Sequence, residues 1–299
     1  MTAPWYRDLY AIGTLADARL VALRVMAAVG VPLIGGVALA HPAAGVAGGA
    51  TALFVTLCDV GTTRATRVGT MLAGWIAIVA GGTLGHELAT VPHGNEWVIL
   101  ASAMVAGWAS GSQPGIAAVT RTLAVAAAAG AGMHSTDPDV LLAVAVGGAS
   151  ALAAAWMMWI ASGLPAADNI IDWRAGVLRA LAGADAGLRF TVCYAAAAAI
   201  ALFAANALHV NDAYWATLVV LMVMRPEGIA SLRLTLHYAV GTLAGVVAAA
   251  GVLHFVQDAL ALAVVATLVA ASARVGLAVN PALGFMAFTI SCCSSSTSS

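Results

Sequence analysis

The residues of this chain that could carry chemistry are a small set of charged side chains placed among long apolar runs. Of 299 residues, twelve are basic, thirteen are acidic and seven are histidines. Every basic residue is an arginine, because the sequence contains no lysine. This excludes the lysine-dependent sites: the phosphate-binding loop, Schiff-base catalysis and the serine–lysine hydrolases. A pump driven by ATP would therefore need a second chain.

The spacing of the histidines and cysteines predicts neither an enzyme nor a metal site. The loop from His86 to Glu96 lacks the His-Glu-x-x-His spacing that places two ligands on one face of a helix. The four cysteines fit no zinc site and no redox pair. No nucleophile–base pair is recognisable either. We therefore expect no catalytic activity, no metal and no cofactor.

Three ionisable residues are candidates for a transport path. Arg121 lies about six residues inside an apolar run, roughly 9 Å deep at ~1.5 Å per residue. A charge at that depth costs ~2.5 kcal/mol or more, so Arg121 either faces a cavity, where it could bind an organic anion, or snorkels back to the interface. His237 could couple transport to protons, and its alternative is a hydrogen-bonded interfacial histidine. Asp59 is a second proton-coupling candidate, and its alternative is a helix cap or salt bridge with the nearby arginines.

Two proline sites are candidates for binding an anion. A polar amide precedes a proline at Gln113-Pro114 and again at Asn280-Pro281. Proline frees a backbone carbonyl and exposes the amino terminus of the following helix, whose partial positive charge favours an anion. The alternative is that each proline begins its helix after a tight loop. With Arg121, Trp215 and Arg225, these residues form the expected substrate pathway.

Composition predicts the kind of fold that must position these residues. Apolar residues make up 62% of the chain and charged residues 8%, against roughly 45–50% and 25% in soluble domains. The prediction is an all-α polytopic membrane bundle with about eleven spans, or twelve with the last one missing. The expected spans are 20–40, 44–58, 68–85, 97–109, 115–133, 139–162, 188–208, 213–224, 234–256, 259–273 and 275–290.

The distribution of charge predicts the orientation of these spans. If the amino terminus is cytoplasmic, all twelve arginines fall on the inner side, and the outer loops carry carboxylates, six of the seven histidines and no basic residue. This is the pattern of the positive-inside rule. We therefore expect a multi-pass protein of a bacterial inner membrane, with its amino terminus in the cytoplasm.

The order of the spans predicts two membrane halves. The first half is residues 1–162 and begins with an interfacial helix; the second is residues 188–290. Between them, residues 163–187 are expected to form a short amphipathic linker helix on the cytoplasmic leaflet. Because each half has six spans or lacks only the last, the halves should be parallel repeats. Residues 291–299 are a serine-rich tail, either flexible or the end of a truncated chain.

The most distinctive stretch, residues 214–245, carries a family resemblance. Its motifs are Tyr214-Trp215-Ala216, Arg225-Pro226-Glu227-Gly228, Arg233 and the run from Val240 to Gly245. A weaker copy occurs earlier, where Val68-Gly69-Thr70 matches Val240-Gly241-Thr242. These motifs resemble the second membrane half of the fusaric-acid-resistance (FUSC) family, which is similar to the aromatic acid exporters and, more remotely, to plant malate channels. The resemblance covers about residues 188–290.

The resemblance implies export of small organic, above all aromatic, acids. We expect a secondary transporter driven by the proton gradient, since the chain has no nucleotide site. Two alternatives remain: a passive organic-anion channel, and a membrane subunit or scaffold that transports nothing. Gly69, Gly241 and Gly245 are expected to pack helices closely, within one chain or between two copies of a homodimer. The expected partners are the lipid bilayer and organic anions, with no nucleic acid.

Overall fold

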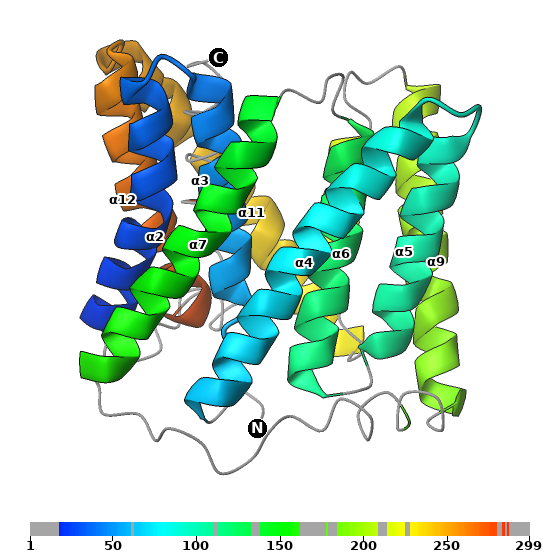
Figure 1. The fold of residues 1–299 in the computed structure, drawn as a ribbon. Coiled ribbons are helices and arrows are strands. Elements are labelled where there is room, and N and C mark those ends of the chain that lie inside the picture. Colours follow the sequence, from blue (N-terminus) through cyan, green and yellow to red (C-terminus); the bar gives the residue numbers. More distant parts are fainter. Residues whose placement is uncertain are drawn as a thin grey trace, which may run out of the picture. The chain divides into compact units, whose positions relative to one another are not determined.

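The protein is helical throughout the part of the chain that the computed structural model describes. That part covers residues 18–60, 63–110, 113–132, 138–161, 178, 184–208, 214–224, 228–279, 283–284 and 286. These residues form ten helices and no strand (Figure 1). The helices are α2 (Ala18–Ala38), α3 (Pro42–Leu57), α4 (Arg64–Ala89), α5 (Gly94–Ala109), α6 (Pro114–Ala131), α7 (Pro138–Ala161), α9 (Ala184–Ala207), α10 (Tyr214–Val223), α11 (Gly228–Phe255) and α12 (Ala259–Val279).

Seven of the described helices are long and apolar enough to cross a membrane. They confirm the prediction of a polytopic helical membrane protein. α3 is a shorter apolar helix of 16 residues, and α10 has only 10 residues. At about 1.5 Å per residue α10 is roughly 15 Å long, about half of the ~30 Å hydrocarbon core of a bilayer.

The ten helices coincide with the first ten expected spans within four residues, except that α11 begins six residues earlier and α12 ends six residues later than expected. The predicted division between spans at 259–273 and 275–290 is wrong, because α12 continues without a break to Val279. Arg274, expected to lie in an inner loop, is inside this helix. A long arginine side chain near a helix end can reach the interface while its helix continues, which explains why the charge does not end α12.

Several expected elements lie outside the described residues. These are the interfacial helix in residues 1–17, nearly all of the linker helix in residues 163–183, and the tail 291–299. α9 begins at Ala184, which was expected to belong to the linker. Asn280 and Pro281, expected near the start of the last span, also lie outside the described part.

The chain divides into two compact units that cut across the two predicted halves. Unit 1 consists of residues 1–56, 137–162 and 232–299, and unit 2 of residues 57–136 and 163–231. Each unit therefore combines helices from the first half of the sequence with helices from the second. The halves 1–162 and 188–290 do not correspond to compact units, and the repeat that relates them stays a prediction.

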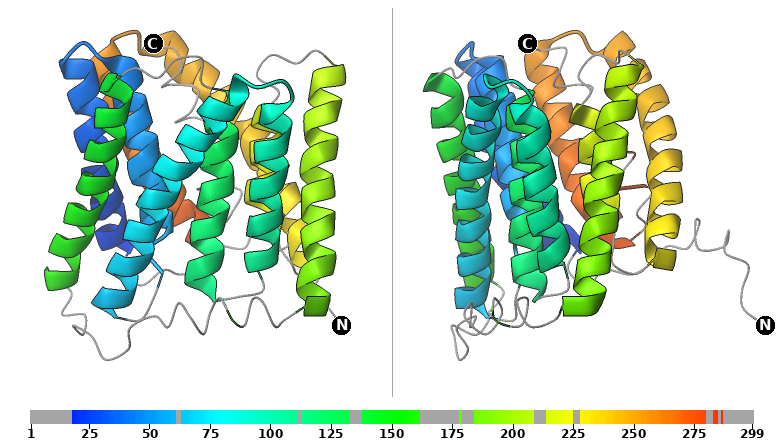
Figure 2. Two further views of the ribbon diagram at one scale, coloured as in Figure 1. Left: turned by 45° about the vertical axis from the view of Figure 1, so that its right-hand side comes forward. Right: turned by 90° about the vertical axis from the view of Figure 1, so that its right-hand side faces the viewer.

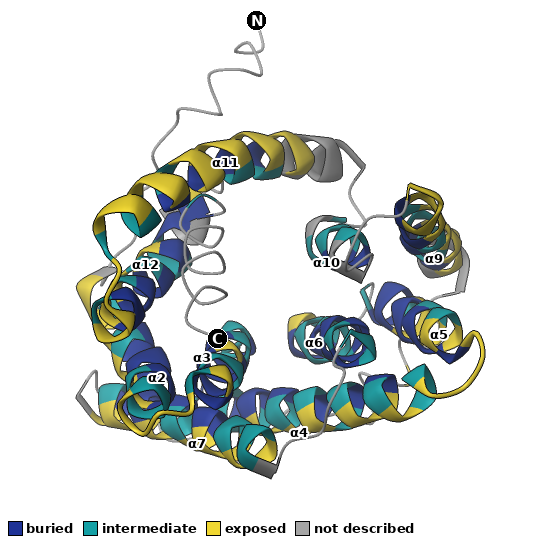
Figure 3. Ribbon diagram, turned by 90° about the horizontal axis from the view of Figure 1, so that it is seen from above, coloured by how far each residue is buried: buried dark blue, intermediate teal, exposed yellow. Residues whose placement is uncertain are grey.

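In unit 1, α2 is the central helix and packs against both α12 and α7 (Figure 3). Pro32 lies inside α2, and a proline within a helix leaves the carbonyl four residues earlier without its helical donor. That carbonyl belongs to Ala28. Oγ of Ser150 in α7 lies 2.7 Å from this oxygen and 2.9 Å from the carbonyl oxygen of Gly147, and its one hydrogen can serve either acceptor. The proline in α2 thus provides an acceptor for a hydrogen bond from α7.

In unit 2, α4 and α6 pack closely along glycines. A Cβ built on Gly81 of α4 would lie 2.5 Å from the carbonyl oxygen of Leu123, and one on Gly85 would collide with the carbonyl of Ala127. Such small residues let two backbones approach where a larger side chain would separate them. α6 also packs against α5 and α10, and α9 runs alongside α5 (Figure 2).

Within each unit the described arginines lie toward one end of the helices. In unit 2, Arg64 and Arg67 begin α4 and Arg189 lies near the start of α9, a helix that runs in the same direction. In unit 1, Arg19 and Arg24 lie in the first turns of α2. Arg274 lies in the last turns of α12, which runs in the opposite direction (Figure 1). This grouping is the one that the positive-inside rule describes, and the cytoplasmic assignment of that end stays a prediction.

Candidate functional site

The connection between α3 and α4 in unit 2 carries a buried carboxylate. The side chain of Asp59 is 4% exposed, and its Oδ2 lies 3.6 Å from Nη1 of Arg67, whose side chain is 28% exposed. A carboxylate removed from water is strongly destabilising unless it is paired. The salt bridge expected at this span end is present, and a role of Asp59 in proton coupling stays a prediction.

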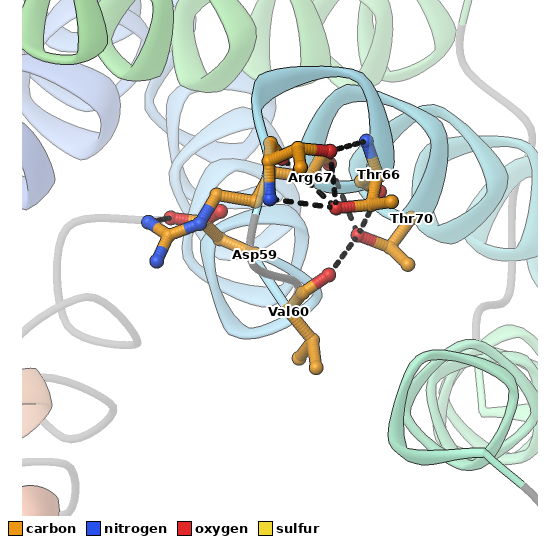
Figure 4. A network of polar contacts seen from close by, with 6 residues as sticks. Asp59, Val60, Thr66, Arg67 and Thr70 are labelled. Carbon is orange, nitrogen blue, oxygen red and sulfur yellow. Dashed lines mark hydrogen bonds and ion pairs between the residues drawn. The ribbon is translucent and has the colours of Figure 1, made fainter. Parts of the chain in front are cut away.

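Three threonines fix the backbone around this ion pair (Figure 4). Thr63 caps α4 with a reciprocal capping box: its Oγ1 accepts from the amide of Thr66 at 3.3 Å, and Oγ1 of Thr66 accepts from the amide of Thr63 at 3.2 Å. Oγ1 of Thr70 lies 3.0–3.1 Å from the carbonyls of Val60, Thr66 and Arg67. Because its single hydrogen serves one acceptor at a time, Thr70 can hold the connection against α4 or bond within the helix.

Cys58, the residue before Asp59, contacts α6 within unit 2. Sγ of Cys58 lies 3.3 Å from Oγ1 of Thr122, and both side chains are buried. Gly74 of α4 makes room for this contact, since a Cβ built there would lie 2.5 Å from Sγ of Cys58. Asp59 is therefore held by contacts from both α4 and α6. No sequence motif predicts the contact between Cys58 and Thr122. The Thr63-x-x-Thr66 capping box could have been predicted from the sequence.

Two arginines near this connection have a buried nitrogen that needs a partner. Nε of Arg64 and Nε of Arg121 are each buried without a hydrogen-bond partner among the described residues. Arg121 is half-buried and is the eighth residue of α6, which places it roughly 10 Å along that helix. A buried donor without an acceptor is destabilising by about 1–3 kcal/mol, and by more when it is charged. Both guanidinium groups are therefore suited to receive an anion.

α6 begins with the predicted polar amide and proline. Gln113 is the N-cap residue and Pro114 the first helical residue, and Gln113 makes no side-chain capping hydrogen bond. Pro114 at this position is compatible with the plain role of starting a helix. The first amide groups of the helix point toward its start, where they favour negative charge. Gln113, Pro114, Arg121 and Asp59 thus all belong to unit 2.

The short helix α10 is held by a tyrosine that the sequence does not single out. Tyr194 of α9 is 1% exposed, and its hydroxyl donates to the carbonyl oxygen of Leu221 at 2.5 Å. This carbonyl lies in the last turn of α10, where the final four carbonyls have no donor within the helix. Thr217 of the same helix is fully buried, and its Oγ1 has no hydrogen-bond partner in the described part of the chain.

The remaining candidates lie on α11 of unit 1, at Gly69 of unit 2 and among the residues outside the description. His237 of α11 is 3% exposed, and Gly241 and Gly245 are buried at successive turns of the same helix face. At Gly69 of α4 a Cβ would meet no atom within 4 Å, so the close contacts of α4 lie at Gly74, Gly81 and Gly85 instead. Arg225, Asn280 and Pro281 lie outside the described residues, as does the side chain of Trp215.

Comparison with protein-family models finds a match for about a third of the chain. Residues 198–298 match a family model described as fusaric acid resistance protein-like. This segment is a fusaric-acid-resistance-like domain. The match confirms the predicted family over its range, which contains α10, α11 and α12, and the FUSC domain is of a kind found in membrane proteins of transporter type. No curated protein and no solved structure matches the chain.

Proposed function

We propose that this FUSC-domain protein is a secondary transporter of the bacterial inner membrane that exports small organic acids, with aromatic carboxylates as the preferred class. The apolar helices and the family match support a multi-pass membrane protein with a transporter-like domain. The substrate class, the direction and the driving force are the proposal.

The observation that carries the proposal is the excess of arginine over carboxylate among the described residues at one end of unit 2. Arg64, Arg67 and Arg121 occupy the first half of α4 and α6, and Asp59 pairs with Arg67. Arg64 and Arg121 keep a buried Nε without a partner among the described residues. A guanidinium group binds a carboxylate through two parallel hydrogen bonds. An organic anion would supply a hydrogen-bond acceptor to the guanidinium groups of Arg64 and Arg121.

The start of α6 is a second position that favours an anion, distinct from Arg121. Its amide groups carry a partial positive charge that is strongest within the first turn. Arg121 lies two turns further along the same helix. An aromatic acid could place its carboxylate near Arg121 while its ring contacts the apolar residues of α6, which is rich in alanine and valine in this region.

The proton gradient is the proposed driving force. Export of an anion needs either a coupled ion or a channel, and protons need a residue that changes its charge along the path. Asp59 in unit 2 and His237 in unit 1 are the two candidates, one carboxylate and one imidazole. Both side chains are buried, as expected for a residue that binds and releases a proton inside a transport path closed to bulk water.

The test is the flux of labelled benzoate and related aromatic carboxylates in inside-out vesicles, with and without a proton uncoupler. The variant is Arg121→Gln, and the matched control is Arg189→Gln, which removes an exposed arginine from the same end of unit 2. We expect uncoupler-sensitive transport whose half-saturation concentration rises roughly tenfold to a hundredfold in Arg121→Gln, the effect of losing a charge-assisted hydrogen bond of ~1.5–3 kcal/mol.

Each other result contradicts part of the proposal. Flux that follows voltage and ignores the uncoupler would identify an anion channel. An inserted, folded chain that moves no carboxylate would favour a scaffold or subunit. Equal loss in Arg121→Gln and Arg189→Gln would show that surface charge, and no specific site at Arg121, attracts the substrate.

A further inference from the structure

A cavity lies in unit 1 where α2 ends and where α3 and α7 begin. Its volume is about 260 Å³. Most of its lining is apolar, with small residues of all three helices such as Gly35, Ala44 and Ala143. It is at the end of unit 1 opposite to Arg19 and Arg24, which lie at the start of α2 (Figure 1). All of its lining residues belong to unit 1, whereas the transport proposal rests on arginines of unit 2.

Close backbone contacts fix the three helices around the cavity. Gly36 of α2 and Gly45 of α3 touch, since a Cβ on either would collide with the backbone of the other helix. Gly48 of α3 likewise faces the carbonyl oxygen of Ala143, which a Cβ would approach to 2.7 Å. The helices cannot move closer to fill the space. At Gly35 a Cβ would meet nothing within 4 Å, so the cavity continues up to the backbone of α2.

The polar groups at the cavity are a histidine and a carboxylate. Nδ1 of His41 lies 3.1 Å from Oδ2 of Asp139, and the two side chains are 59% and 49% exposed. No arginine is among the lining residues. The carboxylate of Asp139 is therefore the anionic group of the described lining, and it lies in the first turn of α7, where it offsets the partial positive charge of that helix start.

We propose that this cavity binds small organic cations that have an apolar body, of the aryl or alkyl ammonium class. The apolar part would occupy the space beside Gly35 and Ala143, where transfer from water is favourable. The ammonium group would remain at the rim next to Asp139, which is partly solvated and can keep its contact with His41. A carboxylate in the same position would be repelled by the carboxylate of Asp139, so the cavity would favour an ammonium over a carboxylate.

Three probes with one ring and different charges test this site. Equilibrium dialysis of labelled benzylammonium, benzyl alcohol and benzoate would be measured against the full chain in lipid nanodiscs, with binding to empty nanodiscs subtracted. We expect benzylammonium to bind more tightly than benzyl alcohol, and benzoate to bind most weakly. A benzoate affinity equal to or above that of benzylammonium would overturn the proposal.

Two variants test the cavity and its charge separately. Gly35→Leu places a side chain in the open space, and we expect the dissociation constant of benzylammonium to rise at least tenfold. Its control is Gly251→Leu on α11 of the same unit, where a Cβ also meets nothing within 4 Å and which is not among the lining residues. Unchanged binding in folded Gly35→Leu would place the ligand elsewhere and refute the site.

Asp139→Asn leaves the packing intact and removes only the charge. We expect it to weaken benzylammonium binding by roughly two- to fivefold, the range for a solvent-exposed ion pair, and to leave benzyl alcohol unchanged. The matched control is Glu96→Gln, which removes the carboxylate of another histidine–carboxylate pair, His93–Glu96 at 2.8 Å. Equal weakening of both ligands, or equal effects of the two variants, would contradict the role of Asp139.

Discussion

At the scale of single residues, the buried carboxylate of Asp59 determines how the α3–α4 connection can be arranged. It is 4% exposed and pairs with an arginine that still reaches solvent. A pair of this kind contributes little net stability compared with apolar residues, but removing one partner leaves the other charge uncompensated. The pair therefore specifies the shape of the α3–α4 connection more than it stabilises the fold.

We predict that Asp59→Asn lowers the free energy of unfolding by about 1–3 kcal/mol, because the guanidinium of Arg67 loses its counter-charge in a mostly buried setting. The measurement is unfolding in mixed micelles followed by circular dichroism. The control is Glu96→Gln, which disrupts a pair whose histidine is 78% exposed and should change stability by less than about 1 kcal/mol. If the double variant Asp59→Asn, Arg67→Gln is no more stable than Asp59→Asn alone, the uncompensated charge is not the cause.

A second residue-scale prediction concerns the hydroxyl of Tyr194. Tyr194→Phe removes the donor to the carbonyl of Leu221 and keeps the ring in its stack with Phe190. The buried carbonyl then loses this donor, which we expect to destabilise the protein by about 1–2 kcal/mol. Hydrogen exchange of the α10 amides should increase as well. Phe203→Leu, an exposed change on the same helix, should alter neither quantity.

At the scale of helices, close packing depends on which glycines face a neighbour. Adjacent glycines on α4 provide a direct comparison, because a Cβ on Gly81 would lie 2.5 Å from the carbonyl of Leu123 and one on Gly82 would meet nothing within 4 Å. We predict that Gly81→Ala destabilises the protein by roughly 1–3 kcal/mol through displacement of α6. Gly82→Ala should be neutral or stabilise by up to about 1 kcal/mol, since alanine has the higher helix propensity. Equal thermal stabilities of the two variants would contradict the α4–α6 contact.

The contact between α2 and α7 gives a prediction about coupling. Ser150→Ala removes the donor to the carbonyl of Ala28, and we expect a cost of about 0.5–1.5 kcal/mol, as for other hydrogen bonds between membrane helices. In a Pro32→Ala background the restored amide of residue 32 can donate to the same carbonyl. There the cost of Ser150→Ala should fall to nearly zero. A double-mutant cycle of unfolding free energies measures this, and additive effects would disprove the link between Pro32 and Ser150.

The sequence predicts the locations of the helices more accurately than it predicts the residues at which they end. Apolar runs indicate ten of them, because hydropathy over a span needs no knowledge of neighbours. Arg274 suggests a loop that does not exist, because one flexible charge inside α12 is tolerated near a helix end. The same holds for the candidate site. Asp59 and the arginines near it could be predicted from the sequence, because charged residues are rare in an apolar chain. The contacts of Cys58 with Thr122 and of Tyr194 with Leu221 depend on tertiary packing, which spacing does not encode.

At the scale of the whole molecule, orientation is the property that the sequence predicts and that labelling can test. In a chain freed of its own cysteines, a cysteine at position 93 should react with an impermeant maleimide in spheroplasts. A cysteine at position 172 should react only after permeabilisation. This follows from the one-sided arginines and the positive-inside rule. Labelling of position 172 from outside would contradict the predicted topology and would place the arginines of unit 2 on the outer side of the membrane.

The division into units could not be predicted from the sequence. Hydropathy places spans in order along the chain and suggests two consecutive halves, yet α5 packs on α9 and α12 packs on α2. These pairings follow from complementary surfaces, such as Gly107 beside Thr191 and Gly30 beside Thr267. Many other helices of the chain carry similar small residues, so composition alone gives no preference among them.

The interleaved units also set an order of events during synthesis. α2 is complete at Ala38, but its partner α12 begins only at Ala259, roughly 220 residues later. At about 5–20 residues per second the ribosome needs on the order of 10–40 s to cover that distance. During this interval α2 must reside in lipid with Gly30 exposed and, until α7 emerges, with the carbonyl of Ala28 lacking the hydroxyl of Ser150. The nascent chain is thus most vulnerable to membrane quality control before its last helices appear, and codon changes that slow the ribosome after α7 should lower the yield of assembled protein.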